Sequence, residues 1–295
     1  MGQSLVSVVI PCYNYGKFLP EAIASIENQT YQNWEIIISD DGSDEDTLKV
    51  VSDFRNHPLI RIIYLENGGP SRARNIAIRA AKGKYILPLD ADDLISPAYM
   101  ETAIRLLESN HNLGIVYCEA KFFGSNNEKW DLPEYSFPAI LLGNRIFVTS
   151  FFRKQDWEKV GGFDEDFLDE WEDFDFWLKI IKLGRNVHRI EEVLFHYRKG
   201  HMSRCVKKGR ELLPLFEQIV NNHKDLYSQN IMYLIEQILI KEELINTQAK
   251  EINAIKQEFD ILVNSAEFRI GYYIKNCISL LLKRLRILYK QFMRN

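Results

Sequence analysis

Short apolar runs alternate with longer stretches of helical periodicity over roughly the first 115 residues of the chain. The short runs are rich in β-branched residues and predict strands at 6–12, 35–39, 60–65, 85–89 and 114–117. The helical period between them predicts helices at 18–28, 44–55, 72–81 and 97–109, with start signals at Ser43 and at Ser96. This alternation is typical of βαβ units, so we expect an α/β domain with a mostly parallel, Rossmann-like sheet flanked by helices.

The pattern becomes less regular after residue 117. Residues 118–150 are aromatic and rich in loop-forming residues, which predicts irregular structure. An acidic start followed by an apolar stripe predicts a helix over 163–183, and two short strands are expected at 187–190 and 194–197. These elements complete a first domain that we place at 1–204.

A helical extension is expected at 205–263, where prolines nearly vanish. Apolar residues recur there every seven positions at Ile231, Ile238, Ile245, Ile252 and Phe259. Such a repeat is typical of a coiled coil, but Lys241 and Gln248 interrupt the complementary seam. A coiled coil and a helix packed on the first domain both remain open.

The last segment, 264–295, is basic. It holds seven Lys and Arg residues and one acid, a net charge of +6, whereas residues 1–263 carry −10. Leucines and isoleucines alternate with these bases at helical spacing, which predicts a basic amphipathic helix on an anionic membrane surface. A helix that packs on the first domain or on a second subunit, giving a homo-oligomer, is the alternative. The acidic body argues against nucleic acid as a partner.

Composition narrows the class of protein. The chain has 295 residues, 46% hydrophobic and 26% charged, which is typical of a globular protein and excludes a largely disordered one. Its four cysteines are widely separated, so neither a disulfide framework nor a zinc site is predicted. The first residues show no signal-peptide pattern and no run approaches the ~18 apolar residues of a membrane span, so we expect a cytoplasmic protein.

Acidic residues follow two of the predicted strands. Asp40 and Asp41 come after the second strand, and Asp90, Asp92 and Asp93 come after the fourth. Ligands of parallel sheets bind at the carboxyl ends of the strands, where two such carboxylates can hold one divalent cation. Helix capping is the alternative for each pair. Neither a G-x-G-x-x-G sequence nor a Walker glycine–lysine pair is present, which argues against dehydrogenases and P-loop proteins.

Together, these and later motifs resemble the family 2 glycosyltransferases of the GT-A fold. The resemblance covers residues 5–204 and rests on VSVVIPCYN at 6–14, DDGS at 40–43, Ala73-Arg74-Asn75, LDADD at 89–93, Gly161-Gly162-Phe163-Asp164-Glu165 and Glu172-Asp173-Phe174-Asp175. It implies a GT-A glycosyltransferase domain that uses a nucleotide-sugar donor, with a UDP-sugar expected.

The resemblance also implies residue roles on the donor side. Pro11, Tyr13 and Asp41 would form the uridine pocket, since an aromatic face stacks on a pyrimidine and a carboxylate accepts its ring N–H. Arg74 would brace the neighbouring acids or touch the nucleotide, and a purely structural ion pair is the alternative. Asp90 and Asp92 match the D-x-D motif and would bind Mn²⁺ or Mg²⁺, with Asp92 in direct contact and Asp90 on the ribose or the metal.

The remaining roles concern the reaction. Asp173, with Glu172 beside it, would be the catalytic base that removes the proton of the acceptor hydroxyl, which implies inversion at the anomeric carbon. Arg198 and His201 would lie over the diphosphate, and His201 would also meet the metal; a surface histidine without a role is the alternative for His201.

The acceptor expected from the family is a glycan or a lipid-linked sugar in surface-polysaccharide biosynthesis. Together with the basic tail, it implies a protein peripheral on the inner face of the cell membrane. A sugar nucleotidyltransferase would need a glycine-rich basic loop where Pro11–Gly16 stands, and a non-catalytic scaffold would not need Asp41, Asp90, Asp92 and Asp173.

Overall fold

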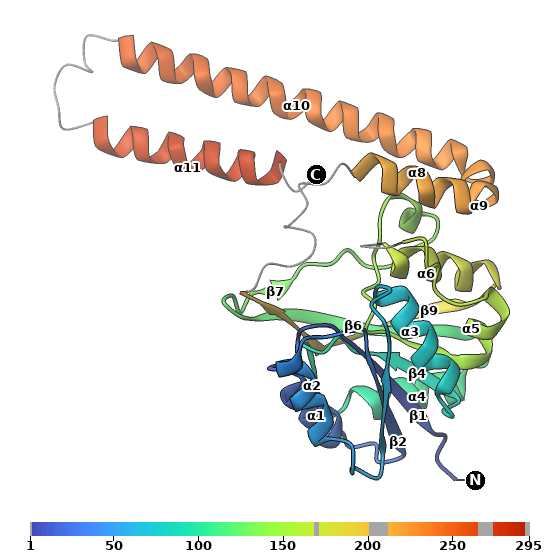
Figure 1. The fold of residues 1–295 in the computed structure, drawn as a ribbon. Helices are drawn as coiled ribbons and strands as arrows, with labels where there is room; N and C mark the ends of the chain where they lie inside the picture. The colour runs from blue at the N-terminus through green and yellow to red at the C-terminus, as the bar shows by residue number, and fades with distance from the viewer. Residues whose placement is uncertain (1, 168–170, 201–211, 265–273, 293–295) are drawn as a thin grey trace. The chain divides into compact units, whose positions relative to one another are not determined.

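The chain forms two compact units, Met1–Lys224 and Asp225–Asn295, in a computed structural model. The structure describes residues 2–167, 171–200, 212–264 and 274–292 (Figure 1). The predicted domain end at residue 204 and the site residue His201 lie outside these ranges. Each unit is described by itself below.

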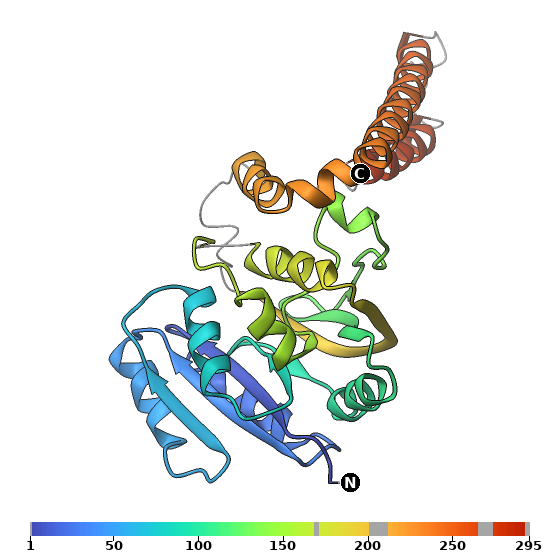
Figure 2. The same cartoon turned by 90° about the vertical axis from the view of Figure 1, so that its right-hand side faces the viewer.

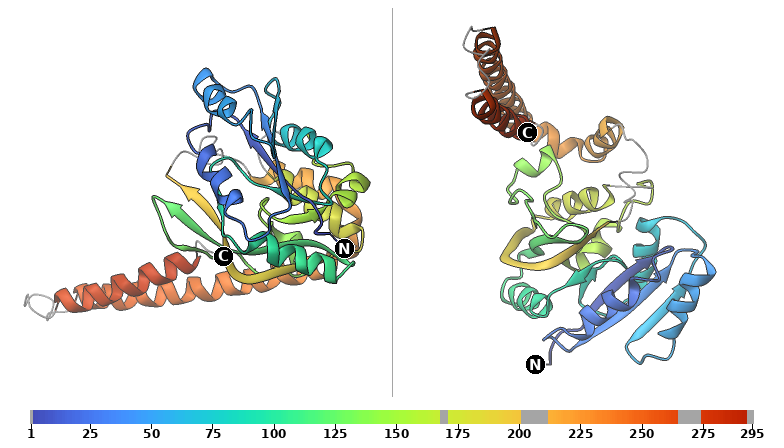
Figure 3. Two further views of the ribbon diagram at one scale, coloured as in Figure 1. Left: turned by 90° about the horizontal axis from the view of Figure 1, so that it is seen from below. Right: turned by 90° about the vertical axis from the view of Figure 1, so that its left-hand side faces the viewer.

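Four parallel strands form the first half of a nine-stranded sheet in the first unit, in the order β3-β2-β1-β4. These strands are β1 (Val6–Cys12), β2 (Trp34–Asp40), β3 (Ile60–Tyr64) and β4 (Tyr85–Pro88). The helices that follow them are α1 (Leu19–Glu27), α2 (Glu45–Asp53), α3 (Pro70–Ala80) and α4 (Tyr99–Ser109). β1 is buried along nearly its whole length because right-handed crossovers place α1 and α2 on one face of the sheet and α3 on the other (Figure 3). The predicted α/β architecture is confirmed.

The two predicted helix start signals, Ser43 and Ser96, are wrong by one and two residues. Asp44, not Ser43, caps α2, and its side chain accepts a hydrogen bond from the Thr47 amide at 2.9 Å. α4 begins at Tyr99 because the Ser96 hydroxyl is used elsewhere, in a 2.7 Å hydrogen bond with His196.

The second half of the sheet is mixed and longer than the sequence indicates. It contains β5 (Leu94–Ile95), β6 (Leu113–Gly124), β7 (Lys129–Trp130), β8 (Phe151–Arg153) and β9 (Asn186–Lys199). β6 and β9 pair in parallel over their full length, whereas β8 is antiparallel to both β4 and β6. Two predictions are corrected here: the segment expected to be irregular from residue 118 begins with the rest of β6, and the two short strands after residue 186 are one strand.

The predicted helix over 163–183 begins later than expected. The chain first forms a short 3-10 helix, η1 (Ala139–Leu142), and then α5 (Lys154–Val160) and α6 (Glu172–Lys182). Gly161 and Gly162 take positive φ angles of 82° and 84°, and Trp171 takes 69°, so the backbone turns sharply on both sides of the acidic stretch. We call residues 164–167 together with Trp171 the acidic loop; residues 168–170 between them lie outside the described ranges. α6 lies beside α5 and β6, and α8 (Leu212–Asn222) packs on α6 (Figure 2).

The second unit is helical, as predicted. It contains most of α9 (Lys224–Gln229), together with α10 (Ile231–Asn264) and α11 (Ile274–Phe292), which lie side by side. Leu234, Gln248 and Ile255 are buried, while Ile231 and Ile238 of the other heptad position are at least half exposed. No helix in the part of the chain that the structure describes has the length and apolar content needed to cross a bilayer.

Candidate functional site

The predicted donor residues gather at one edge of the sheet. β1 lies between β2 and β4, and the chain changes its direction of winding there; parallel sheets bind their ligands at such a point, at the carboxyl ends of the strands. Pro11 belongs to the end of β1, opposite Ser39 of β2, and Tyr13 follows with half of its surface exposed. Tyr13 therefore lies at the same edge of the sheet as Asp41 and Asp90, which follow β2 and β4.

Asp41 is fixed by the loop that precedes α3. Its two carboxylate oxygens accept hydrogen bonds from the amides of Gly68 and Gly69, both at 2.9 Å. Asn67 donates to its main-chain carbonyl at 2.9 Å. Burial raises the pKa of Asp41, although these amides partly offset the effect. The carboxylate thus has a fixed orientation, and its remaining lone pairs can accept a further donor.

Arg74 joins two acidic segments that lie far apart in the sequence. Its guanidinium donates to Asp90 at 2.7 Å and to Glu172 at 2.6 Å, and only 2% of the side chain is exposed. Burial opposes the charge, but the two carboxylates raise the pKa of Arg74 above its ordinary value. Arg74 thus forms ion pairs with both acids. It brings the D-x-D loop next to the first turn of α6.

Arg198 holds the other side of the D-x-D loop. Its amide donates to the Asp93 carboxylate at 2.9 Å, and its Nε donates to the Asp92 carbonyl at 2.8 Å. The guanidinium also bonds Glu21 at 2.6 Å and lies over the rings of Phe18 and Phe123. Burial and the neighbouring acids raise the pKa of Asp93 well above its ordinary value. The structure therefore places Arg198 within β9 and beside the D-x-D loop.

A divalent cation would find oxygen ligands on Asp90 and Asp92. Within residues 2–167, 171–200, 212–264 and 274–292, no three His, Cys, Asp or Glu side chains converge on one point. The Asp90 side chain is 29% exposed and one of its oxygens is bound to Arg74. Two hard oxygen donors suit Mg²⁺ or Mn²⁺, which bind proteins through one or two carboxylates when substrate phosphates complete the coordination. The residues fit a cation that is shared with a diphosphate.

Asp173 has the properties of a general base. It lies in the first turn of α6 and accepts a 2.7 Å hydrogen bond from the Phe174 amide. Burial, and then the charge of Glu172, raise the pKa of Asp173 to about 7. Glu172 itself is held by Arg74, so of the two predicted catalytic acids Asp173 is the one suited to exchange a proton near neutral pH.

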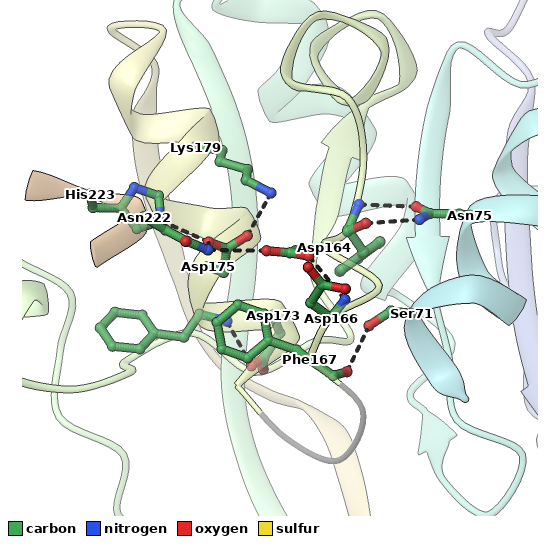
Figure 4. A network of polar contacts seen from close by, with 12 residues as sticks. Ser71, Asn75, Asp164, Asp166, Phe167, Asp173, Asp175, Lys179, Asn222 and His223 are labelled. Carbon is green, nitrogen blue, oxygen red and sulfur yellow. Dashed lines mark hydrogen bonds and ion pairs between the residues drawn. The ribbon is translucent and has the colours of Figure 1, made fainter. Parts of the chain in front are cut away.

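The acidic loop is anchored on α3. The Asn75 amide oxygen accepts from the Phe163 and Trp157 N–H groups at 3.0 and 3.2 Å, and its nitrogen donates to Phe163 and Glu165 at 2.8 and 2.9 Å. Ser71 donates to the Phe167 carbonyl at 3.3 Å (Figure 4). Asn75 is 4% exposed, so these bonds are shielded from water. The helix that carries Arg74 therefore also positions the segment that leads to Asp173.

Sequence reasoning missed a second anchor, formed by Asn222 and His223 at the end of α8. Both bond the buried Asp175 of α6 (Figure 4). Of these three residues, only Asp175 belongs to a motif used in the sequence analysis. Its burial could not be predicted, because a run of acidic residues is usually a solvent-exposed helix face.

Comparisons with known proteins agree with this geometry. The sequence model described as glycosyl transferase family 2 matches residues 7–180. A chondroitin synthase from Escherichia coli is 32% identical over 191 residues, which cover 62% of this chain and 27% of that protein. An uncharacterized glycosyltransferase from Haemophilus influenzae is 31% identical over 212 residues, which cover 68% of this chain and 71% of that protein. The chain thus spans about a quarter of the chondroitin synthase.

Two solved structures share the fold. S. aureus TarS 1-349 in complex with UDP-GlcNAc has a TM-score of 0.61 at 22% identity, over 73% of this chain and 64% of that chain. The mannosyltransferase PcManGT from Pyrobaculum calidifontis, in complex with GDP-Man and Mn²⁺, has a TM-score of 0.56 at 20% identity, over 90% of this chain and 81% of that chain. These similarities show the GT-A fold.

Proposed function

Since the chain belongs to glycosyl transferase family 2, we propose that it moves a sugar from a UDP-sugar to a hydroxyl of a glycan or lipid-linked acceptor in surface-polysaccharide biosynthesis. The observation that carries this proposal is the buried Arg74, which joins Asp90 of the D-x-D loop to Glu172 beside Asp173. The Arg74 guanidinium therefore has Asp90, which is suited to the donor side, at one end. At its other end lies Glu172, next to the base Asp173.

Asp173 acts as the base in this proposal. It takes the proton of the acceptor hydroxyl while that oxygen attacks the anomeric carbon from the side opposite the diphosphate. The bond between the anomeric carbon and the diphosphate oxygen breaks in the same displacement, so the configuration inverts. A divalent cation held by Asp92 and Asp90, when bound, offsets the negative charge on the departing diphosphate.

The other site residues bind the donor. Tyr13 and Pro11 pack against the uracil ring, and Asp41 accepts its ring N–H, which supports a UDP-sugar over donors that lack this N–H group. Arg198, which holds the D-x-D loop, contacts the diphosphate in this proposal. The TarS structure with UDP-GlcNAc and the PcManGT structure with GDP-Man and Mn²⁺ support a nucleotide-sugar donor and a cation.

Nucleotide release tests the proposal. The purified chain is mixed with a panel of nucleotide sugars, an acceptor extract and Mn²⁺, and release of the nucleoside diphosphate is measured with and without EDTA. We expect release with a UDP-sugar, its loss in EDTA, and a decrease of about tenfold or more in Asp92→Ala. The exposed Asp53 of α2 provides the matched control, Asp53→Ala, which should keep full activity. Full activity of Asp92→Ala, or no release with any donor, would contradict the proposal.

The pH dependence of transfer should follow the titration of Asp173. The base works only when deprotonated, and its pKa is about 7, so kcat/KM should rise about tenfold per pH unit below pH 7 and level off above it. Initial rates between pH 5 and 9 measure this profile. The residual activity of Asp173→Asn should lack the rise; the same rise in that variant would assign it to another group.

We also propose that the second unit attaches the enzyme to the inner face of the cell membrane. Leu282, Ile287 and Tyr289 of α11 are more than half exposed and alternate with bases along the helix. Lys283, Arg284, Arg286 and Lys290 are these bases. Exposed apolar and basic side chains on one helix support binding in an anionic interface. The exposed residues of α10, including Ile231 and Ile238, are where a homo-oligomer would form.

Vesicle binding tests the attachment. Each base near an anionic surface contributes about 1 kcal/mol, so K283Q/R284Q should weaken binding to phosphatidylserine-containing vesicles about 30-fold. Co-sedimentation at fixed ionic strength measures the partition coefficient. The exposed Lys250 and Lys256 of α10 offer a matched control, K250Q/K256Q, with little change expected. Equal weakening in both pairs would indicate a response to net charge alone.

A further inference from the structure

A fully buried carboxylate lies two residues after Asp173. Asp175 of α6 is 0% exposed, and its Oδ1 lies 2.9 Å from His223 Nε2 and 3.0 Å from Asn222 Nδ2 (Figure 4). Lys179 Nζ forms an ion pair with the other oxygen at 2.7 Å. Burial raises the pKa of Asp175, but the contacts with His223, Lys179 and Asn222 outweigh it and lower the pKa overall. The carboxylate is therefore ionised and accepts from all three side chains.

Asn222 also ties the beginning of the acidic loop to the helix that ends it. Its Nδ2 group donates to Asp164 Oδ2 at 3.0 Å as well as to Asp175. Asp164 is the first residue of the acidic loop, and Asp175 lies in the first turn of α6. One amide thus fixes the separation of the two ends of the loop, from the side opposite the anchor on Asn75.

α8 also contacts the residue directly before the catalytic pair. Trp171 has a φ angle of 69°, a conformation that a bulky residue adopts only when its surroundings hold it there. Its ring packs edge-to-face on Phe174 and on Phe216 of α8, at centroid distances of 5.9 and 6.1 Å. The contacts of α8 therefore concentrate on both ends of the acidic loop.

We propose that the C-terminal end of α8, through Asn222 and His223, positions the base Asp173 for transfer. The inference rests on the proposed function, in which Asp173 is the base. α8 lies beyond residues 7–180, which match the family model, so Asn222 and His223 stand outside the matched region. His223 is 1% exposed, and burying an imidazole for packing alone would cost more than burying an apolar side chain. We assign these two residues as positioning residues, acting on Asp173 through Asp175 and Asp164.

Steady-state kinetics of the full-length chain test the inference. We expect His223→Leu to lower kcat about tenfold or more, with the donor KM within about twofold of wild type, because a misplaced base slows transfer without weakening donor binding. His223→Gln should recover most of kcat, since its amide nitrogen can donate to Asp175 as Nε2 does. Asn222→Ala should also lower kcat. The exposed Asn221 provides the matched control Asn221→Ala, which should behave as wild type.

Calorimetric titration with UDP and Mn²⁺ separates positioning from partial unfolding. It gives the fraction of molecules that bind the nucleotide, and kcat is expressed per binding-competent molecule. Unchanged kcat on this basis in both His223→Leu and Asn222→Ala, with an active wild type, would overturn the inference and leave the proposed function intact. A wild type that releases no nucleotide with any donor would instead refute the proposed function.

Discussion

Asp173→Asn is expected to lower kcat by about 10²–10⁴-fold, the range over which a positioned acid or base contributes. Asparagine keeps the size of the side chain and can still accept the hydrogen bond from the Phe174 amide, so α6 should retain its first turn. It cannot take a proton from the acceptor hydroxyl. The donor KM should stay within about threefold, because donor binding does not depend on this proton transfer. Initial-rate kinetics with varied donor and acceptor measure both constants.

Asp166→Asn is the matched control for this change. Asp166 belongs to the same acidic loop, loses the same charge and is exposed. Its kcat should remain within about twofold of wild type if proton transfer at Asp173, rather than the negative charge of the loop, is required. Similar losses in both variants would assign the effect to the electrostatic field of the loop and would contradict the role of Asp173.

Arg74→Met should lower the free energy of unfolding by about 3–5 kcal/mol, because removing one partner of a buried ion pair leaves uncompensated charge. Methionine fills much of the same volume, so the loss would come from Asp90 and Glu172 and not from a cavity. Glu172 is 8% exposed and would have to take up a proton or turn outward. Urea unfolding followed by circular dichroism measures the change.

Two companion variants make the result specific to the ion pairs. Arg74→Met combined with Glu172→Gln should recover part of the lost stability, since the buried charge is removed together with its partner. Arg79→Met, at an exposed position on the same helix, should change the free energy of unfolding by no more than about 0.5 kcal/mol. If the double variant were no more stable than Arg74→Met, packing would account for the loss.

The local pattern of apolar residues was sufficient to predict the strands in the first half of the sheet, but not those in the second half. β1, β2 and β4 are covered by helices on both faces, so their sequences are continuous apolar runs. β6 loses this pattern after Cys118, where its side chains become partly exposed and its register with β9 shifts. The pairing of β6 with β9 joins residues more than 70 positions apart, which no local period reveals.

The candidate site divides in the same way. Asp41, Asp90 and Asp92 were predictable because strand ends in parallel sheets share one edge, and Asp173 followed from the family resemblance. Their partners in the structure were not predictable, because the contacts of Arg74 with Glu172 and of Asp175 with His223 depend on how α3 and α8 pack on α6. The starts of α2 and α4 were misplaced because Ser43 and Ser96 had competing hydrogen bonds that only the folded chain contains.

The short strands at the margins of the nine-stranded sheet also bear on aggregation. At one end of the sheet β5 pairs with only two of the fourteen residues of β9, and β7 adds two residues beside β6, so these two short strands add little edge of their own to which a strand from another molecule could pair. β3 closes the other end with five residues, of which Arg61 is exposed, and a charged edge residue opposes such pairing. A five-residue edge that carries a charged side chain is a poor template for another strand, so the β3 end of the sheet resists edge-to-edge association between molecules.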